Sequence, residues 1–590
     1  MVAGAAQGFV IGVWSVDRSA RPGDVRFVSR AREVRFVEPV EVLCAHALEQ
    51  VVPCVSRVEA AVADGLHAAG FIAYEAAPAF NSDLRTHAPG PLPLVWFGLF
   101  QQRTETGPCC QTAAPFSVGP WSAEVGEVDY LDAIRRIREL IAAGDTYQVN
   151  YTFPMQAVFK GDALSWFRRL ERAQRADYAA FIDAAPFTIL SASPELFFRL
   201  EGDTLETRPM KGTRPRGRWF DEDRRLAAEL AASEKDRAEN VMIVDLLRND
   251  MGRISDTGSV HVASLFDVER YETVWQMTST IRSKTSAPLP EILAALFPSG
   301  SVTGAPKVRT MQIIHDLEPA PRGVYCGAVG WYSPGRRAEF NVAIRTVAID
   351  QNEGTARYHI GSGITWGSSA EAEYDECLIK AAVLAEDRPE FQLLESLLFN
   401  GKYVLLDEHL ARLARSAEYF GFEVHLGAVR AALLDQAATF KDGPLKVRLL
   451  AARDGTHRIE AGPATPGTPV RLGFAAEPVD DRDVFLYHKT THRAVYERAR
   501  ASRPDCDDVL LWNARGEVTE TTTANVVLDI DGWLWTPPVA AGLLAGTMRA
   551  SLLADGTIQE RVLTKADIAR AASVRLINSV RQWVDAVLVA

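Results

Sequence analysis

A charged, proline-containing stretch from Glu386 to Glu390 interrupts the chain after a long helical pattern. Stretches of this kind separate domains, because few contacts cross them. We therefore expect one domain over residues 1–385, a linker over 386–390 and a second domain over 391–590. The 590 residues are 47% hydrophobic, which is enough for two well-packed cores.

The charge and hydropathy of the chain disfavour two classes of function. There are 64 lysine and arginine residues against 76 aspartate and glutamate residues, so the formal net charge is −12. Nucleic acid binding would need a basic stripe, so we expect no nucleic acid partner. No apolar run approaches the roughly 18 residues of a membrane span, and the first residues lack the basic region of a secretory signal. We expect no membrane role and a cytoplasmic location.

Before the linker, hydrophobic side chains recur with two different periods. Residues 25–30, 207–213 and 340–349 alternate apolar and polar side chains, which is typical of strands. Residues 129–144 and 291–297 repeat apolar side chains at helical spacing. The first domain is therefore predicted to have a large mixed α/β (α+β) fold.

Two acidic doublets occur in helical segments of this domain. Asp236 and Glu239 lie in SEKDRAENVMIVDLLRND, and Glu373 and Glu376 lie in EAEYDECLIKAA. Because each doublet has i, i+3 spacing, its two carboxylates share one helix face. Two such helices could hold a hard cation such as Mg²⁺ between them. Taken alone, the doublets could equally be solvated acidic faces.

Lys211 lies in TRPMKGTRPR between Pro209 and Gly212, in a segment that resembles a turning strand more than an exposed helix. A lysine held there could lose solvent, which lowers its pKa and frees its amine as a nucleophile. A surface lysine in a basic loop is the alternative. The glycines of GSGITWG, residues 361–367, lack the spacing of a dinucleotide fingerprint, but they could let backbone amides approach a substrate carboxylate.

Taken in order, segments of the first domain resemble the chorismate-utilising enzymes, the family of anthranilate synthase component I and aminodeoxychorismate synthase component I. The resemblance covers about residues 1–385 and implies antiparallel sheets and chorismate as substrate. The segments that carry it are IAAGDTYQVNYT (141–152), SPELF (193–197), TRPMKGTRPR (207–216), AENVMIVDLLRNDMGRI (238–254), SVTGAPK (301–307), RGVYCGAVG (322–330), FNVAIRT (340–346), GSGIT (361–365) and EYDECLIKA (373–381).

This resemblance implies roles for individual residues. Glu239 and Glu376 would hold Mg²⁺ against a carboxylate of chorismate, and Asp236 and Glu373 would lie beside the metal. The groups that would receive the two substrate carboxylates are Tyr325, Arg345, Lys380 and the amides around Gly304 and Gly363. A guanidinium and oriented amides suit such anions.

Lys211 and Gln276 indicate which branch of the family the first domain resembles. The lysine of PMKGT is similar to that of the aminodeoxychorismate enzymes, where it adds to the chorismate ring as the hydroxyl leaves and ammonia then displaces it at the para position. Gln276 stands where relatives often have a histidine that assists pyruvate elimination. A glutamine cannot act as a general acid or base at neutral pH.

The ammonia source is not expected within this chain. No cysteine occurs in a GxCxGxQ setting, so no built-in glutaminase domain can be argued. The resemblance therefore implies a separate glutamine amidotransferase subunit, for which free ammonia could substitute.

The second domain carries a different set of chemical groups. Pyridoxal phosphate needs a lysine for the Schiff base, an acid for the pyridine nitrogen, and an arginine with turn amides for the phosphate. Lys489, Glu520, Arg412 and the turn at Gly546 and Thr547 could supply them. Each is weak alone, because a lone lysine after a strand is more often a surface residue.

The order and spacing of these groups resemble the fold-type IV pyridoxal phosphate enzymes, which have two-lobed domains. That family covers branched-chain and D-amino acid aminotransferases and aminodeoxychorismate lyase. The resemblance implies that Lys489 is the Schiff-base and proton-transfer residue and that Glu520 pairs with the pyridine nitrogen. Arg412 and Thr547 would form the phosphate site.

Within that family, the segment RLINSVRQW, residues 575–583, favours the lyase over the aminotransferases, with Arg581 expected at the substrate. Gln582 departs from the family pattern, because glycine is usual there. Enzymes of this fold are usually dimers, so we expect a homodimer formed through residues 391–590.

Together the two resemblances imply a synthase that aminates chorismate to 4-amino-4-deoxychorismate, fused to a lyase that eliminates pyruvate and leaves 4-aminobenzoate for folate. One alternative is an anthranilate synthase component I fused to an amino-acid aminotransferase, against which Lys211 and Gln276 argue. A second is a docking protein with one degenerate half. A third, a salicylate or isochorismate synthase, would leave the lyase domain without a substrate.

Overall fold

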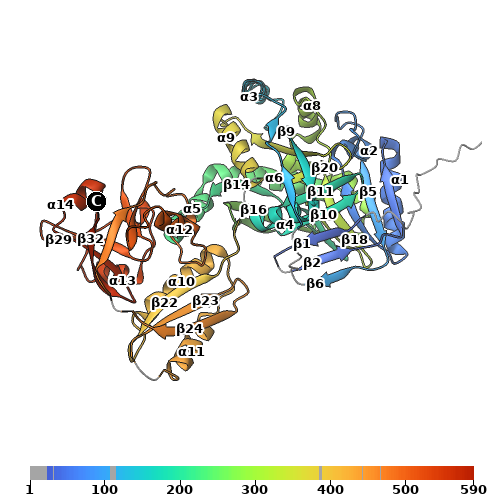
Figure 1. The fold of residues 1–590 in the computed structure, drawn as a ribbon. Helices are drawn as coiled ribbons and strands as arrows, with labels where there is room; N and C mark the ends of the chain where they lie inside the picture. The colour runs from blue at the N-terminus through green and yellow to red at the C-terminus, as the bar shows by residue number, and fades with distance from the viewer. Residues whose placement is uncertain are drawn as a thin grey trace, which may run out of the picture. The chain divides into compact units, whose positions relative to one another are not determined.

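The computed structural model describes residues 23–30, 32–106, 114–384, 388–440, 443–465 and 467–589. Its internal contacts divide the chain into two compact units (Figure 1). Unit 1 contains Met1–Pro215 and Ala227–Arg388, and unit 2 contains Arg216–Leu226 and Pro389–Ala590. Of the linker expected over residues 386–390, the described part is 388–390.

Two antiparallel sheets form the framework of unit 1. In the described residues, the first has 11 strands in the order β17-β9-β21-β20-β11-β10-β1-β2-β6, with β7 and β8 also paired to β9. Its strands are β1 (Val25–Val28), β2 (Glu33–Phe36), β6 (Thr104–Thr106), β7 (Phe116–Val118), β8 (Ser122–Ala123), β9 (Gln148–Gly161), β10 (Tyr178–Ala184), β11 (Phe187–Ser193), β17 (Gly304–Ala305), β20 (Thr346–Asp350) and β21 (Thr355–Ile364).

The second sheet of the same described part has ten strands in the order β14-β16-β13-β12-β19-β18-β4-β5-β3, with β15 also paired to β16. Its strands are β3 (Glu41–Ala45), β4 (His67–Ile72), β5 (Val95–Phe100), β12 (Leu196–Glu201), β13 (Thr204–Arg208), β14 (Met210–Pro215), β15 (His261–Arg270), β16 (Val274–Lys284), β18 (Ala328–Ser333) and β19 (Arg337–Val342).

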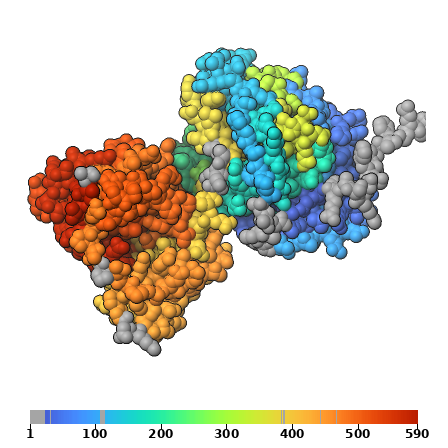
Figure 2. Space-filling view, in the orientation of Figure 1, coloured from blue at the N-terminus to red at the C-terminus, as the bar shows by residue number. Residues whose placement is uncertain are grey.

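Helices pack on both sheets, and apolar side chains fill the space between the sheets. The helices are α1 (Leu48–Ala63), α2 (Ala77–Phe80), α3 (Glu127–Ala142), α4 (Ala163–Gln174), α6 (Glu234–Gly252), α7 (Leu289–Leu296), α8 (Lys307–Leu317) and α9 (Ala370–Ala381). One buried cluster joins Phe27 and Ile182 of the first sheet to Phe71 and Trp331 of the second. Helices α3 and α9 contact each other and form neighbouring light blue and yellow patches of the surface in Figure 2.

Unit 2 contains two further sheets. A three-stranded antiparallel sheet, β22-β23-β24, is flanked by α10 and α11, and an eight-stranded mixed sheet runs β27-β26-β25-β32-β31-β28-β29-β30 in the described residues, with β27 also paired to β28. The elements are β22 (Leu393–Phe399), α10 (Leu406–Phe420), α11 (Leu426–Ala437), β23 (Leu445–Ala451), β24 (His457–Pro463), β25 (Val470–Phe474), α12 (Ala494–Ala501), β26 (Asp508–Trp512), β27 (Val518–Thr521), β28 (Asn525–Ile530), β29 (Trp533–Thr536), α13 (Thr547–Ala554), β30 (Gln559–Glu560), α14 (Lys565–Arg570), β31 (Ser573–Asn578) and β32 (Gln582–Leu588).

The mixed fold with antiparallel sheets that the sequence predicts is confirmed. The stretch 340–349, however, forms two strands rather than one, because β19 ends at Val342 and β20 begins at Thr346. Arg345 between them has φ +50°, a left-handed conformation that breaks an extended strand. Among the described residues, no helix is both long and apolar enough to span a membrane.

Candidate active sites

Helices α6 and α9 present the two acidic doublets of unit 1. The hydroxyl of Ser233 caps α6 by accepting a hydrogen bond from the Asp236 amide at 3.3 Å. Burial raises the pKa of Glu239, and the negative charges of Asp236 and Glu373 add to that rise. The pKa of Glu239 thus responds to a carboxylate on each helix, so the doublets face a common region.

Basic side chains partly balance these carboxylates. Lys380 Nζ lies 2.8 Å from Glu376 Oε1, and Lys235 Nζ lies 3.9 Å from Glu239 Oε1. Burial raises the pKa of Glu376, but the charge and hydrogen bond of Lys380 and the charges of Lys211 and Lys235 together outweigh burial, so the net shift is downward. In the described part of the chain, no three aspartate, glutamate, histidine or cysteine side chains lie close enough together to hold a metal ion.

Lys211 lies on β14, where Gly212 adopts φ +94°. A Cβ placed on Gly363 would lie 2.7 Å from Lys211 Nζ and 2.8 Å from Gln148 Nε2, so the lysine amine reaches the glycine of β21 directly. Burial lowers the pKa of Lys211, whereas the Glu239 charge opposes that shift. The turning strand expected around Lys211 is therefore present, and its amine is less basic than a surface lysine.

Gln276 on β16 forms two hydrogen bonds to β14, the strand that carries Lys211. Its Nε2 donates to the Gly212 carbonyl at 2.9 Å, and Thr213 Oγ1 donates to its Oε1 at 3.0 Å. These two hydrogen bonds fix the backbone on the C-terminal side of Lys211. The structure thus gives Gln276 a part in positioning Lys211.

The expected carboxylate ligands of unit 1 are only partly brought together. Lys380 Nζ donates to the Gly361 carbonyl at 2.9 Å, and Gly304 lies close to Gln148, whose carbonyl oxygen would be 2.0 Å from a Cβ on that glycine. Arg345 instead donates a hydrogen bond to the Gln174 side chain. The Tyr325 ring stacks on His359 with centroids 5.2 Å apart. Gly361 and Gly363 lie within β21.

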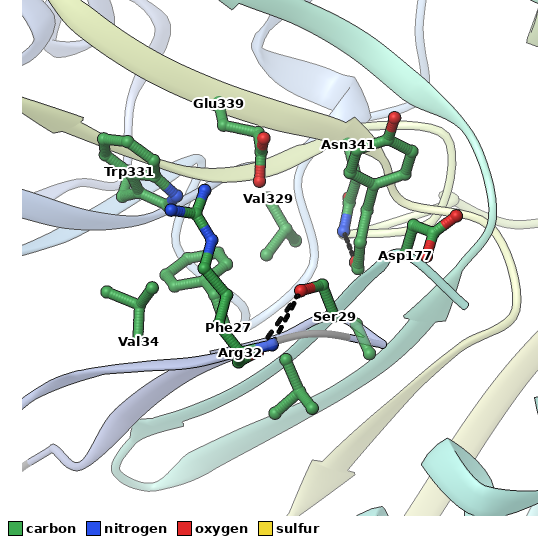
Figure 3. A pocket seen from close by; sticks show the side chains of 12 residues that line it. Phe27, Ser29, Arg32, Val34, Asp177, Val329, Trp331, Glu339 and Asn341 are labelled. Atoms are coloured by element: carbon green, nitrogen blue, oxygen red, sulfur yellow. Dashed lines mark hydrogen bonds between the residues drawn. The ribbon is translucent and has the colours of Figure 1, made fainter. Parts of the chain in front are cut away.

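Two cavities lie elsewhere in unit 1. The cavity shown in Figure 3 is bounded by Phe27, Ser29 and Trp331, and the Arg32 side chain is directed toward Trp331. Its volume of about 20 Å³ has room for about one water molecule. A larger cavity of about 270 Å³ has Tyr325 in its wall, and it includes none of the other carboxylate ligands expected in the described chain.

In unit 2, Lys489 and Glu520 form the centre of a second candidate site. Glu520 on β27 is buried, and its oxygens accept hydrogen bonds from the Tyr496 hydroxyl at 2.9 Å, the Leu544 amide at 3.1 Å and Asn525 Nδ2 at 3.1 Å. Burial raises the pKa of Glu520 to about 8. Burial also lowers the pKa of Lys489 to about 8, and the charge of Arg412 adds to the shift.

Arg412 is held by Glu395 and extends to the turn before α13. Its Nε and Nη2 donate to Glu395 at 2.9 and 2.6 Å, and its Nη1 donates to the Ala545 carbonyl at 3.4 Å. His409 lies 2.6 Å from Glu395 through Nδ1 and 3.3 Å from the Thr547 hydroxyl through Nε2. Arg412 and Thr547, expected to share one site, are therefore linked by a buried network.

Arg581 lies in the turn between β31 and β32, where the hydroxyl of Ser579 lies 3.0 Å from His409 Nε2 of this network. The Arg581 backbone amide donates to Asn578 Oδ1 at 2.8 Å, and the residue is exposed. The expected role of Arg581 in binding the substrate stays a prediction.

Comparison with known families agrees with the division into two units. The family model of chorismate binding enzymes matches residues 18–386, which is more than half of the chain. The chain belongs to the chorismate binding enzyme family. A second model, that of the class IV aminotransferases, matches residues 392–589, so this member of the family carries an additional domain.

Aminodeoxychorismate synthases are among the similar proteins. The aminodeoxychorismate synthase of Streptomyces pristinaespiralis is 44% identical over 255 residues, 43% of this chain and 35% of that protein. Aminodeoxychorismate synthase component 1 of Salmonella typhimurium is 43% identical over 272 residues, 46% of this chain and 60% of that protein. The chain thus spans less than two thirds of the length of either relative.

Among solved structures, anthranilate synthase component I from Streptococcus pneumoniae aligns with a TM-score of 0.54 and 23% identity. The alignment covers 61% of this chain and 93% of that one. At this identity the likeness shows the fold of the chorismate binding part.

Two residues of this chorismate binding enzyme were not singled out from the sequence. Glu195 is buried and accepts a hydrogen bond from Ser301 Oγ at 2.5 Å; burial raises its pKa to about 7, and the Lys211 charge acts against that rise. Gln148 is fully buried, and neither atom of its amide has a hydrogen-bond partner. Gln148 lies in segment 141–152 and Glu195 in segment 193–197, and the resemblance of these segments to the family could have indicated both residues.

Proposed function

We propose that unit 1 aminates chorismate to 4-amino-4-deoxychorismate and that unit 2 eliminates pyruvate from it, leaving 4-aminobenzoate. The observation that carries this proposal is the position of Lys211, whose amine reaches Gly363 and whose pKa depends on Glu239 and Glu376. The names of the similar aminodeoxychorismate synthases support the first step. The class IV aminotransferase match supports the second.

In the first step, Lys211 would act as the nucleophile. Its amine forms a bond to the chorismate ring while the bond to the ring hydroxyl breaks, and ammonia then displaces the lysine at the para position. The departing hydroxyl needs a proton, and the incoming nitrogen must lose one. Glu195, with a pKa of about 7 and an electrostatic interaction with Lys211, suits both transfers at neutral pH.

The carboxylates of α6 and α9 fit a magnesium ion by their chemistry. Oxygen donors are what Mg²⁺ prefers, and Asp236 and Glu373 are close enough to Glu239 for their charges to add to the rise in pKa that burial causes. Glu239 and Glu376 would hold the ion, with Asp236 and Glu373 next to it. When bound, the ion would supply positive charge for a substrate carboxylate.

The residues of unit 2 fit pyridoxal phosphate. Glu520 is buried among hydrogen-bond donors, where a carboxylate can pair with a pyridine nitrogen, and Arg412 lies at the turn that begins α13 at Thr547. Lys489, with a pKa of about 8, would bind the cofactor through its amine. When bound, the cofactor would supply an electron sink.

The chain's part in the second step is then a proton transfer. Lys489 would remove the ring proton of 4-amino-4-deoxychorismate at the carbon that becomes aromatic, since its lowered pKa leaves more of its amine free at neutral pH. Aromatisation expels the enolpyruvyl side chain as pyruvate. Glu520 would pair with the pyridine nitrogen of the bound cofactor.

Two partners complete the proposal. A separate glutamine amidotransferase subunit would supply ammonia, with free ammonium as its substitute. A homodimer through residues 391–590 is expected, and light scattering of the purified chain would give the mass that decides it.

Replacing Lys489 tests the assignment of the two steps. In a mixture of chorismate, ammonium, Mg²⁺ and pyridoxal phosphate, Lys489→Ala should accumulate 4-amino-4-deoxychorismate, because the first step does not use this lysine. Lys402→Ala, an exposed lysine of unit 2, is the matched control and should form 4-aminobenzoate normally. Formation of 4-aminobenzoate by Lys489→Ala at the unmodified rate would reject the proposal.

A further inference from the structure

A segment from the first half of the sequence belongs to unit 2. Residues Arg216–Leu226, which we call the strap, group with unit 2, whereas the residues on both sides of them group with unit 1. The strap follows β14 and contains the start of α5 (Phe220–Ala232). The strap contacts Tyr419, Tyr487, Asp481 and Glu418, all of which belong to unit 2.

Arg216 is fixed within the strap by a buried ion pair. Its side chain is 6% exposed, and its Nε and Nη2 each donate to an oxygen of Asp223 at 2.7 Å. Asp223 also accepts a hydrogen bond from the Gly217 amide at 2.9 Å. A bidentate pair with a third donor holds the guanidinium in one orientation.

The same guanidinium holds Tyr419, in the last turn of α10. Arg216 Nη2 donates to the Tyr419 carbonyl at 2.9 Å, and its guanidinium carbon lies 4.4 Å from the centre of the tyrosine ring. The Tyr419 hydroxyl donates to the Gly217 carbonyl at 2.7 Å. The strap therefore binds both the backbone and the hydroxyl of this tyrosine.

Tyr419 in turn packs against His488, the residue before Lys489. The two rings have centroids 4.2 Å apart, and His488 Nδ1 lies 3.0 Å from Ser416 Oγ. Burial lowers the pKa of His488 to about 3, and the Arg216 charge adds to the lowering, so this ring is neutral at physiological pH. A neutral ring in a buried aromatic stack has little freedom to move.

A second contact of the strap reaches the preceding residue. Trp219 packs on Tyr487 with ring centroids 5.4 Å apart, and Arg218 forms an ion pair with Asp481 at 3.5 Å. The strap thus packs directly on Tyr487 and contacts His488 through Tyr419. On the other side, the Lys489 carbonyl accepts a hydrogen bond from the Leu394 amide at 2.9 Å.

We propose that Arg216 is a positioning residue for the cofactor-binding lysine, acting through Tyr419 and His488 to fix the backbone from which Lys489 extends. The inference rests on the proposed role of Lys489. A lysine side chain has four rotatable bonds, so its amine is placed accurately only where its backbone is held. The strap supplies that support from a part of the sequence that precedes the second domain.

Arg216→Lys in the full-length chain tests this role. Lysine keeps the charge but cannot make the bidentate pair and stack on the tyrosine ring together. The matched control is Arg224→Lys, also in the strap, whose ion pair with Glu418 is exposed on both sides. Three quantities are measured for each chain: the dissociation constant for pyridoxal phosphate, the absorbance spectrum of the bound cofactor across pH, and the circular dichroism.

Arg216→Lys should bind the cofactor about ten-fold more weakly, as expected for the loss of one charge-assisted hydrogen bond. Its bound cofactor should show a shifted pH titration of absorbance, with unchanged circular dichroism. Tyr419→Phe, which loses only the hydroxyl bond to the strap, should change both quantities less and in the same direction. Arg224→Lys should match the unmodified chain.

Two results would overturn the inference. If Arg216→Lys and Tyr419→Phe both bind the cofactor with unmodified affinity and an unmodified pH titration, Arg216 does not position Lys489. If the unmodified chain takes up no pyridoxal phosphate, the proposed function of unit 2 is itself wrong, and the positioning role fails with it.

Discussion

Replacing Glu395 with glutamine should destabilise unit 2 in a pH-dependent way. Glu395 is 2% exposed and interacts with Arg412 and His409. Burial alone would raise the pKa of Glu395, but the charges and hydrogen bonds of these two partners together outweigh it and lower the pKa to about 2. Glutamine keeps the shape of the side chain and removes its charge.

The size of the effect follows from this pKa. A carboxyl with an ordinary pKa of 4.5 that falls to about 2 on folding contributes about 3 kcal/mol to the free energy of unfolding at pH 7. Because the folded pKa is the lower one, the contribution is complete above the unfolded pKa and is lost as the pH falls from about 4.5 to about 2. At pH 3 less than half of this contribution should remain, about 1 kcal/mol.

Urea unfolding followed by pulsed hydrogen exchange would measure the loss in the free energy of unfolding, read from peptides of residues 389–590. At pH 7, Glu395→Gln should lower the urea midpoint by about 1 to 3 M, the range given by about 3 kcal/mol and usual denaturant slopes. The difference should shrink to less than half at pH 3. Glu460→Gln, which removes a partly exposed carboxylate of β24, is the control. Equal midpoints at pH 7, or a loss that does not change with pH, would refute the reasoning.

Three further predictions concern Lys211, Gln276 and Lys489. Lys211→Ala should slow formation of 4-amino-4-deoxychorismate by about a hundred-fold or more, yet still convert supplied 4-amino-4-deoxychorismate to 4-aminobenzoate; a wild-type first step would exclude Lys211 as nucleophile. Gln276→Ala should slow the same step several-fold, as expected for the loss of about one hydrogen bond, and the rate of chorismate consumption measures this. An unchanged rate would show that Gln276 does not position β14 for the reaction. Lys489 has a pKa of about 8, so the unprotonated fraction of its amine rises about ten-fold from pH 7 to pH 9. The rate of pyridoxal phosphate uptake by the cofactor-free chain should rise by the same factor over that range and then level off. A rate that continues to rise to pH 10 would indicate an unperturbed lysine.

Local sequence patterns predict the parts of the fold and site that depend on near neighbours. The i, i+3 doublets are on helices α6 and α9, and Lys211 is on a strand beside a left-handed glycine, as expected from periodicity and from Gly212. Such features follow from residues within one or two turns of each other. They identify the groups that carry charge and reactivity.

Contacts between residues far apart in the sequence could not be predicted. Glu195 is placed by Ser301, 106 residues away, and Arg216 by Tyr419, 203 residues away. No spacing along the chain indicates which distant backbone will lie beside a side chain, because sheet pairing and packing decide it. The break at Arg345 is similar in kind, since alternating side chains continue through it and only its backbone conformation ends the strand.

The most direct test of the two-step function is one incubation of the purified chain with chorismate, ammonium, Mg²⁺ and pyridoxal phosphate, with the aromatic products separated by chromatography and identified by mass. The proposed function predicts 4-aminobenzoate together with pyruvate. Anthranilate as the product would contradict the role given to Lys211 and would make the second unit an aminotransferase with another substrate.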